Sequence, residues 1–597
     1  MFVFFFRFKK ILRESTIKEL KELKRLKKYL SRYKRRMIIG CVFVIITNIF
    51  ALLGPWVLKV AIDELEKKLS SELLIKYAAL LAGLALIEGV FRFLMRQTII
   101  GVSRHIEYDL RNDFFSHLQK LSLSFYHKFK TGDLMARTTN DLEAVRQVVG
   151  PAVMYSFNTL LSMAAFGIML YIDWRLTLMA MIPFPIMALA VNKIANRLHK
   201  AYEGIQAKYA DITSKVQENL SGIRVVKAYV QESRELETFQ NLNRDYISKN
   251  LAMSKTRGAM WAGMTLLVGA GSLIVLWFGG RLVMQEQISL GDFVAFFAYL
   301  GNLTWPMIAL GWVINLIQQG TASMGRMNRV FEMEPEIRDD ARTHLEIQQL
   351  AGEIEFRNVS FAYNGTPVLK NINLKIKKGM TLAIVGPTGS GKSTLINLVP
   401  RLIEAKEGRV LIDGKPIEEI PLAVLRSHIG YVPQETFLFS DTIKANIAFG
   451  VEAASQQEIE EAAVNSQIKK DVVDFPAGFD TMLGERGINL SGGQKQRTAI
   501  ARAVIRKPRI LILDDALSAV DTYTEEAILE RMRQIMRERT SIIVSHRIST
   551  VKDADLIVVL DDGEIKERGT HDELVARGGL YAELHRKQLL EEALDEA

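Results

Sequence analysis

Nine residues in the second half of the chain have the composition and spacing of a phosphate-binding loop. The segment Gly386-Pro-Thr-Gly-Ser-Gly-Lys-Ser-Thr394 follows an apolar run, residues 380–385, that predicts a buried strand, and precedes an apolar stretch that predicts a helix. The motif requires this order of strand, loop and helix. Its glycines let backbone N–H groups surround a phosphate, and the helix N-terminus adds positive potential. The predicted nucleotide-binding residues here are Gly386, Pro387, Thr388, Gly389, Ser390, Gly391, Lys392, Ser393 and Thr394.

A second segment supplies a carboxylate for a metal ion. Residues 510–514, Ile-Leu-Ile-Leu-Asp, predict a buried strand that ends in Asp514. In phosphate-binding-loop proteins such an aspartate and the loop serine hold Mg²⁺, while the loop lysine contacts the β- and γ-phosphates. Those roles fall to Asp514, Ser393 and Lys392. The two segments together predict a site for a nucleoside triphosphate with Mg²⁺.

A glycine-containing segment between these two predicts another surface for an anion. Leu490-Ser-Gly-Gly-Gln494 precedes a helical pattern, so its backbone N–H groups and the helix N-terminus would face outward. A chain that already holds phosphates in its own loop has no evident use for a second such surface. We therefore expect Ser491, Gly492, Gly493 and Gln494 to cover the nucleotide of a second subunit.

The composition predicts two environments for the chain. Its 597 residues are too many for one compact domain, and the long uncharged apolar runs all lie before about residue 320. The single cysteine, Cys41, excludes an intrachain disulfide. Residues 7–36 carry 14 Lys and Arg against 3 Asp and Glu, directly before the first apolar run. This position favours retention on the cytoplasmic side, with an amphipathic helix on anionic lipid, over binding of nucleic acid.

Six segments are long and apolar enough for the roughly 20 helical residues that cross a bilayer. They are residues 37–60, 73–94, 149–172, 176–194, 260–283 and 293–317. An even count with a basic N-terminus inside places both termini in the cytoplasm. The connections 96–148 and 195–258 are long, polar and helical in pattern, so they are expected to project into the cytoplasm. Their tips, residues 124–128 and 222–227, are candidate contacts for a soluble domain.

The predicted fold is therefore multi-domain: a six-helix α-helical transmembrane domain followed by an α/β P-loop ATPase domain. The predicted boundaries are 1–36 for the basic segment, 37–320 for the transmembrane domain, 321–351 for a linker and 352–597 for the nucleotide-binding domain. Alternating strand and helix patterns after Gly352 indicate a partly parallel sheet. A hairpin is expected over residues 556–568, turning near Asp562-Gly563.

With these motifs in place, the chain resembles an ABC transporter half of the multidrug- and lipid-exporter type over nearly its full length. The resemblance implies that ATP is the nucleotide. It identifies Tyr363 as the aromatic that stacks on adenine, Gln434 as the Q-loop residue near Mg²⁺, and His546 as the switch histidine near the γ-phosphate. Asp521 matches the D-loop, which faces the partner's site. Residues 484–487 match the exporter segment that touches the intracellular loops.

One position departs from the family pattern. A glutamate that polarises the attacking water usually follows the metal-binding aspartate, and here that position is Asp515. The shorter side chain retracts the carboxylate by about 1 Å, a misplacement that can cost ~10²-fold in rate. Catalysis by Asp515, Gln434 and His546 is therefore expected to be weak, while ATP binding is retained.

Members of the resembled family with this substitution and an intact Leu-Ser-Gly-Gly-Gln usually pair with a different half that carries the catalytic glutamate. We therefore expect a heterodimeric exporter of amphipathic or hydrophobic compounds in the cell membrane, with a second ABC half, membrane lipids and a small amphipathic substrate as partners and no nucleic acid. A homodimeric lipid flippase is the first alternative. An ATP-gated channel or sensor with an ABC domain is an alternative of another class.

Overall fold

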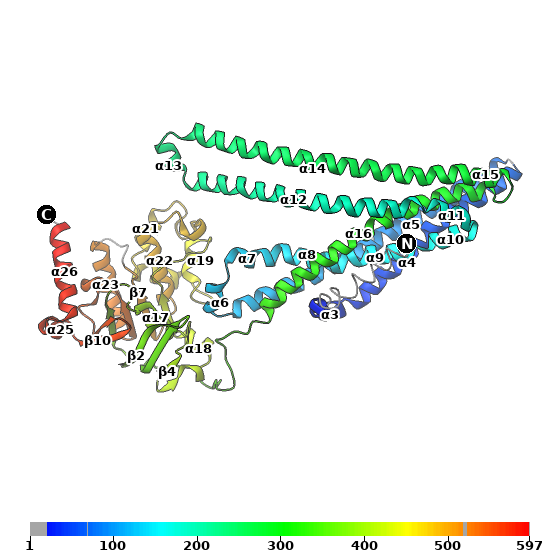
Figure 1. Ribbon diagram of the computed structural model, residues 1–597. Coiled ribbons are helices and arrows are strands. Elements are labelled where there is room, and N and C mark those ends of the chain that lie inside the picture. The colour runs from blue at the N-terminus through cyan, green and yellow to red at the C-terminus, as the bar shows by residue number, and fades with distance from the viewer. Residues whose placement is uncertain (1–20, 69, 518–521, 596–597) are drawn as a thin grey trace. The chain divides into compact units, whose positions relative to one another are not determined.

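The computed structural model describes residues 21–68, 70–517 and 522–595, which divide into two compact units. The first comprises residues up to Leu118 together with Thr131–Met333, and the second comprises Gln119–Lys130 together with Glu334 onward. The predicted order, a helical membrane-spanning part before an α/β domain, is confirmed. Figure 1 shows the long helices of the first unit and the sheets of the second.

The first unit is built almost entirely from helices. Five helical stretches of the described residues are long and apolar enough to cross a membrane: Lys34–Lys67, Ser71–Lys120, Thr131–Ile172, Glu232–Met284 and Leu290–Phe331. Their elements are α4 (Lys34–Lys67), α5 (Ser71–Lys120), α7 (Thr131–Ala136), η2 (Arg137–Asp141), α8 (Leu142–Gln147), η3 (Val148–Ala152), α9 (Val153–Ser162), α10 (Ala164–Ile172), α14 (Glu232–Ile274), η4 (Val275–Gly279), α15 (Gly280–Met284) and α16 (Leu290–Phe331). A short helix, α3 (Leu26–Arg32), precedes them and buries Leu26 and Tyr29.

The fourth predicted span, residues 176–194, is not one continuous helix. It is divided between α11 (Trp174–Ala180) and α12 (Pro183–Ser221). Pro183 has no N–H to donate, and its ring displaces the preceding turn, so a new helix begins there. The predicted span 176–194 therefore contains a break between two helices at this proline.

Polar contacts join α4 to the first third of α16. Pro55 lacks the N–H that would reach the Ala51 carbonyl, and Asn302 Nδ2 lies 3.4 Å from that oxygen. One turn away, the Tyr299 hydroxyl donates to the Leu52 carbonyl at 2.9 Å. At the N-terminus of α16, the Gly291 N–H donates to Asp63 at 2.8 Å. Buried polar groups in a membrane need such partners, so these bonds fix α4 against α16.

The two long polar connections have short helices at the predicted tips, residues 124–128 and 222–227. The second projects as an antiparallel hairpin of α12 and α14 that lie side by side, with α13 (Ile223–Ala228) at its tip (Figure 1). No residue of α13 is buried. The tip of the first connection, α6 (Leu123–Lys128), belongs to the second unit. There Phe125 is buried, and the Ser124 hydroxyl donates to Glu336 at 2.5 Å.

The second unit contains two sheets. The first has the order β2-β1-β4-β5 and is antiparallel: β1 (Ile354–Tyr363), β2 (Thr366–Ile376), β4 (Glu407–Ile412) and β5 (Lys415–Pro416). The second has the order β10-β9-β3-β8-β7-β6: β3 (Thr381–Val385), β6 (Ile429–Val432), β7 (Ile510–Asp514), β8 (Thr540–Val544), β9 (Leu556–Asp561) and β10 (Glu564–Gly569). It is parallel from β9 to β6, and the predicted hairpin is confirmed as β9–β10.

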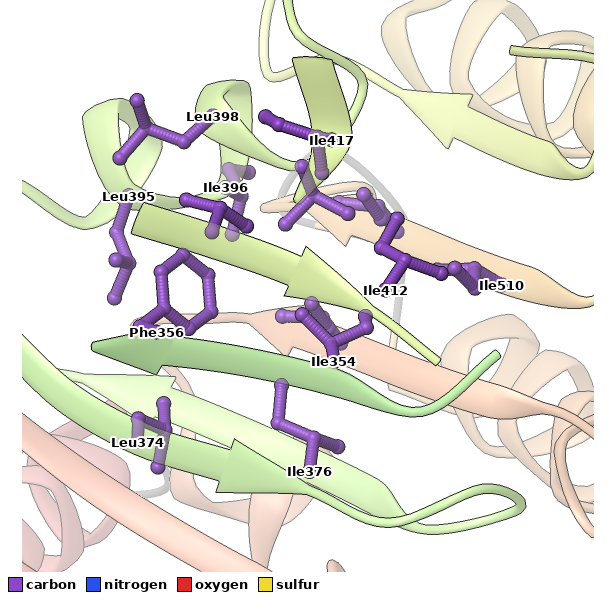
Figure 2. Close-up of a cluster of buried hydrophobic side chains, with 14 of the residues drawn as sticks. Ile354, Phe356, Leu374, Ile376, Leu395, Ile396, Leu398, Ile412, Ile417 and Ile510 are labelled. Atoms are coloured by element: carbon purple, nitrogen blue, oxygen red, sulfur yellow. The ribbon is translucent and has the colours of Figure 1, made fainter. Parts of the chain in front are cut away.

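Helices connect and cover these strands. They are α17 (Lys392–Leu398), α18 (Leu422–Ser427), α19 (Ile443–Ala448), α20 (Gln456–Asn465), α21 (Lys469–Asp474), α22 (Gly492–Val504), α23 (Thr522–Met536), α24 (Ile548–Val551), α25 (His571–Arg577) and α26 (Leu580–Asp595). A buried apolar cluster joins the two sheets around α17, with Phe356 from β1, Leu395 and Ile396 from α17, and Ile510 from β7 (Figure 2). This packing fixes the helix that follows the phosphate-binding loop.

The segment predicted as a linker begins later than expected. α16 continues to Phe331, so the first part of the predicted linker, from residue 321, is helical. Beyond it, the chain is attached to the antiparallel sheet by the Asp413 carboxylate, which accepts the N–H groups of Ala351, Gly352 and Glu353 at 2.7, 3.0 and 2.9 Å.

Candidate nucleotide site

The predicted site residues follow the carboxyl ends of four neighbouring parallel strands. In the order β3-β8-β7-β6, the phosphate-binding loop follows β3, His546 follows β8, Asp514 ends β7 with Asp515 directly after it, and Gln434 follows β6. Ligands of open parallel sheets bind at this edge because all the connecting loops and helix N-termini face it. The topology thus brings together residues that lie up to about 160 positions apart in the sequence.

Two glycines of the loop cannot be replaced without displacing backbone. Gly386 has φ of +146°, and a Cβ there would lie 2.0 Å from the Leu560 carbonyl oxygen. Gly391, the residue before α17, has φ of +101°, and its Cβ would lie 2.9 Å from the Val368 oxygen. Only glycine combines these φ values with such close backbone approach. The loop is therefore held tightly against β2 and the end of β9.

Lys392 is folded into the loop that precedes it. It is 6% exposed, and its Nζ donates to the carbonyls of Gly386 at 2.9 Å and Pro387 at 2.8 Å. Burial lowers the pKa of Lys392, and the negative charges of Asp514 and Asp515 partly offset that effect. Ser390 Oγ, also buried, has no hydrogen-bond partner among the described residues. A buried ammonium and an unsatisfied hydroxyl in one glycine loop fit the oxygens of a polyphosphate.

Asp514 lies at the centre of the group and is 3% exposed. Burial raises its pKa, as does the neighbouring charge of Asp515, while a hydrogen bond from Ser393 and the charges of Lys392 and His546 lower it. Ser393, Lys392 and His546 therefore all act on one carboxylate. A buried carboxylate beside a hydroxyl is a set of hard oxygen ligands that fits Mg²⁺ when it enters with phosphates.

Asp515 has a constrained backbone. Its φ is +47°, in the left-handed region that aspartate tolerates better than most residues. Its N–H donates to the Val544 carbonyl at 2.8 Å, and its own carbonyl accepts from Gln496 of α22 at 3.4 Å. The main chain at Asp515 is thus attached both to β8 and to α22.

Three other predicted residues lie at the margin of this group. Tyr363 ends β1, is 38% exposed, and packs edge-on against Phe361 with ring centres 4.8 Å apart. Gln434 is exposed just beyond β6, and His546 is exposed just beyond β8. Gln434 and Tyr363 form no hydrogen bond or ion pair with the buried group in the part of the chain that the structure describes. Asp521 lies outside the described residues.

The predicted signature segment forms the N-terminus of α22. Ser491 is its N-cap and is exposed: its Oγ accepts the Gln494 N–H at 3.3 Å, while Gln494 Oε1 accepts the Ser491 N–H at 3.0 Å. This reciprocal capping box leaves the hydroxyl proton of Ser491 available to an acceptor. Gly492 is exposed as well and Gly493 is buried. The surface is accessible, as expected for a segment that covers a second subunit's nucleotide.

Two side chains that support the site were not predicted from the sequence. Asp471 of α21 accepts from Gln494 and Arg497 of α22. Gln588 of α26 accepts the Ile548 N–H at 2.8 Å and donates to the His546 carbonyl at 3.3 Å, so it holds the backbone on both sides of the switch histidine. Both lie in segments without a motif, and only the fold brings them to the site.

Comparison with known proteins agrees with this geometry. The family model for the ABC transporter transmembrane region matches residues 37–307, and the ABC transporter model matches residues 369–518. The chain is 38% identical over 573 residues to the probable multidrug resistance ABC transporter ATP-binding/permease protein YheI of Bacillus subtilis, covering 95% of this chain and 98% of that protein. It is 36% identical over 578 residues to the ATP-dependent lipid A-core flippase of Syntrophus aciditrophicus, covering 96% and 95%.

A solved structure extends the likeness to three dimensions. The structure of a bacterial Atm1-family ABC exporter with ATP bound superposes with a TM-score of 0.75 and 30% identity, covering 93% of this chain and 98% of that one. Together with the parallel-strand site and the membrane-spanning helices, these matches settle the family. The chain belongs to the ABC transporters, as a multi-pass membrane exporter whose ABC domain binds ATP and couples its hydrolysis to transport.

Proposed function

We propose that this chain is one half of a heterodimeric ABC exporter of amphipathic or hydrophobic compounds, and that its own ATP site binds nucleotide but hydrolyses it slowly. The observation that carries the proposal is the carboxylate at Asp515, one methylene shorter than the glutamate expected there. Its main chain is bonded to Val544 and contacted by Gln496, so the backbone cannot advance to compensate for the missing length. A displacement of about 1 Å can cost ~10²-fold in rate.

The groups assigned to binding are intact. Lys392 and the loop N–H groups would hold the phosphates, Tyr363 would stack on the base, and Ser393, Asp514 and Gln434 would hold Mg²⁺. When bound, Mg²⁺ neutralises phosphate charge and orients the γ-phosphate. His546 would contact that phosphate from the end of β8. The proposed asymmetry therefore lies in the water-activating step alone.

Two exposed regions support a partner half. The signature N-terminus of α22 is accessible, because Ser491 and Gly492 are exposed. The tip of the α12–α14 hairpin exposes apolar side chains, with Val225 61% and Tyr229 73% accessible. Exposed apolar groups at a helix tip indicate a surface that another protein covers. In the assembly we propose, the signature and Asp521 of this chain complete the partner's ATP site. There a glutamate of the partner would activate the water that attacks ATP.

Transport would follow from closure of the two nucleotide-binding domains. ATP binds the closed pair more tightly than the open one, and that difference in affinity shifts the membrane helices between inward- and outward-facing states. The helix tips α6 and α13 are the proposed transmission points. We place the exporter in the cell membrane with both termini in the cytoplasm, because the basic segment precedes the first span.

The spans carry few charges, which favours amphipathic or apolar cargo such as the compounds handled by multidrug exporters. A homodimeric lipid flippase is the second candidate, supported by the 36% identity to the lipid A-core flippase. In that case Asp515 would be a slow but sufficient base. The two candidates differ in the activity of the chain by itself.

The decisive experiment measures ATPase activity of the purified chain alone, of the chain with the half-transporter encoded beside it, and of both with Asp515→Glu. We expect little activity alone, a large gain in the pair, and a further gain with Asp515→Glu. Full activity from the single chain, unchanged by Asp515→Glu, would reject the asymmetric pair and support the homodimer. ATP-dependent dye uptake into inside-out vesicles that contain the pair tests transport itself, and its absence would favour a gated channel or sensor.

A further inference from the structure

A carboxylate outside every motif fixes the first turn of the signature helix. Asp471 lies on α21, and its Oδ1 accepts from Gln494 Nε2 at 3.0 Å and from Arg497 Nη2 at 3.1 Å. Its other oxygen forms an ion pair with Arg497 Nη1 at 2.9 Å. The side chains of Arg497 and Asp471 are only 13% and 19% exposed, so solvent screens this pair less than a surface ion pair.

The chemistry of Asp471 determines how Gln494 is oriented. An ionised carboxylate only accepts hydrogen bonds, so the NH₂ end of the Gln494 amide must face it. The carbonyl end is then directed at the Ser491 N–H, which it accepts at 3.0 Å. If the residue at 471 could also donate, the amide could turn over and lose the capping box. The charge at Asp471 thus sets the geometry of Ser491 through one intervening side chain.

Arg497 fixes the carboxylate in turn. Besides its ion pair with Asp471, it donates to the Gln467 carbonyl at 3.1 Å and to the Gly493 carbonyl at 3.4 Å. The guanidinium therefore joins the segment before α21, Asp471 and the first turn of α22. A planar group with several donors in a fixed arrangement suits such a three-way contact.

The position of α21 itself does not depend on these polar contacts. Ile468 and Val472 are fully buried in an apolar cluster with Leu438, Ile443 and Leu490. A neutral residue at 471 should leave α21 in place and remove only its link to the signature turn. The packing of α21 and the positioning of Gln494 can therefore be tested separately.

We propose that Asp471 is a positioning residue for ATP hydrolysis in the partner's site: it holds Gln494, and through it Ser491, in the geometry that the γ-phosphate of the opposing nucleotide requires. The inference rests on the proposed function, in which this signature completes the competent site. Asp471 acts through Gln494 and is therefore a positioning residue, not a catalytic one. Its effect is exerted across the subunit boundary, while ATP binding in its own chain is unaffected.

The test compares Asp471→Asn with Asp474→Asn, an exposed carboxylate on the same helix whose loss changes the net charge equally. In the purified pair, Asp471→Asn should lower kcat for ATP about tenfold, since a displacement of ~1 Å can cost ~10²-fold and an amide reorientation moves Ser491 less. Asp474→Asn should stay within about twofold. Binding of a fluorescent ATP analogue to this chain alone should be the same for both variants.

A second experiment distinguishes an effect on the position of Ser491 from a general loss of structure. In a Ser491→Ala background, where the hydroxyl is already gone, Asp471→Asn should add little further loss of kcat. An undiminished tenfold loss in that background, or a kcat for Asp471→Asn equal to that of Asp474→Asn, would overturn the proposal. If the transporter is a homodimer, the same Asp471 effect is expected in the single-chain ATPase, so failure of the heterodimer leaves this test intact.

Discussion

Two helix N-termini in the second unit, both proposed to face phosphates, are held by different means. The N-terminus of α17 is fixed by backbone: Gly391 is pressed against the Val368 carbonyl, Lys392 is buried, and the helix packs between two sheets. The N-terminus of α22 is exposed and is fixed by side chains, the Ser491–Gln494 capping box and Asp471. The first is complete within its own chain. The second is exposed at Ser491 and Gly492, and its shape depends on side-chain contacts.

The difference between the two N-termini predicts that substitution of Lys392 has the largest effect on ATP binding. Replacing it with alanine removes the buried ammonium that contacts both loop carbonyls and the predicted phosphates, so affinity of the single chain for ATP should fall by at least ~10²-fold, about 3 kcal/mol. Equilibrium binding of a fluorescent ATP analogue measures this. The control is Lys378→Ala, at an exposed lysine before β3. Retained ATP binding by Lys392→Ala would show that the loop backbone alone is sufficient.

The second effect concerns the backbone constraint at Gly391. Alanine there meets both an unfavourable φ of +101° and the Val368 oxygen at 2.9 Å. Gly365 is a matched control, because its φ of +89° has nothing within 4 Å of an added Cβ. We expect Gly365→Ala to cost about 1 kcal/mol and Gly391→Ala about 1–3 kcal/mol more, through the added clash. Thermal unfolding of the full chain compares them, and equal shifts would contradict the tight packing of the loop.

A third effect follows from the buried Asp514. Its folded pKa is raised above the ordinary 3.8, mainly by burial. A carboxyl with a raised folded pKa destabilises the fold above that pKa, and this cost fades as the pH falls toward 3.8. Asp514→Asn should therefore raise the unfolding midpoint of the nucleotide-free chain at neutral pH, by about 2–4 °C per kcal/mol recovered.

The same substitution should abolish the Mg²⁺-dependent part of ATP affinity, because the amide cannot supply the charge that the metal requires. Asp474→Asn serves as the control for a change of one charge. A lowered midpoint at pH 7 for Asp514→Asn, or unchanged Mg²⁺ dependence, would show that Asp514 is kept for the fold and not for the metal.

The same difference explains which parts of the site could be predicted from the sequence and which could not. The α17 site is local: a strand, nine consecutive residues and a helix define it, and the structure has them as β3, the loop and α17. The contacts of α22 are not local, since Asp471 and Gln588 carry no motif and reach the site only through tertiary packing. In the membrane unit, apolar length identified the spans, but it did not register that Pro183 interrupts the fourth. The helix boundary at Phe331 was missed because α16 continues as a polar helix beyond its apolar part.

The smallest expected effect tests whether the charge of Arg497 or its hydrogen-bonding geometry holds the signature segment. Arg497→Lys keeps the positive charge beside Asp471, but a single ammonium cannot reach the carboxylate and the Gln467 and Gly493 carbonyls at once. If geometry holds this N-terminus, ATPase activity of the pair should fall about two- to threefold with the unfolding midpoint nearly unchanged, a loss of about 0.5 kcal/mol in transition-state stabilisation. Full activity in Arg497→Lys would mean that charge alone steadies Asp471. A loss as large as that of Asp471→Asn would instead show that Arg497, and not Asp471, determines the position of Gln494. The carboxylate would then be ineffective without the guanidinium that fixes it.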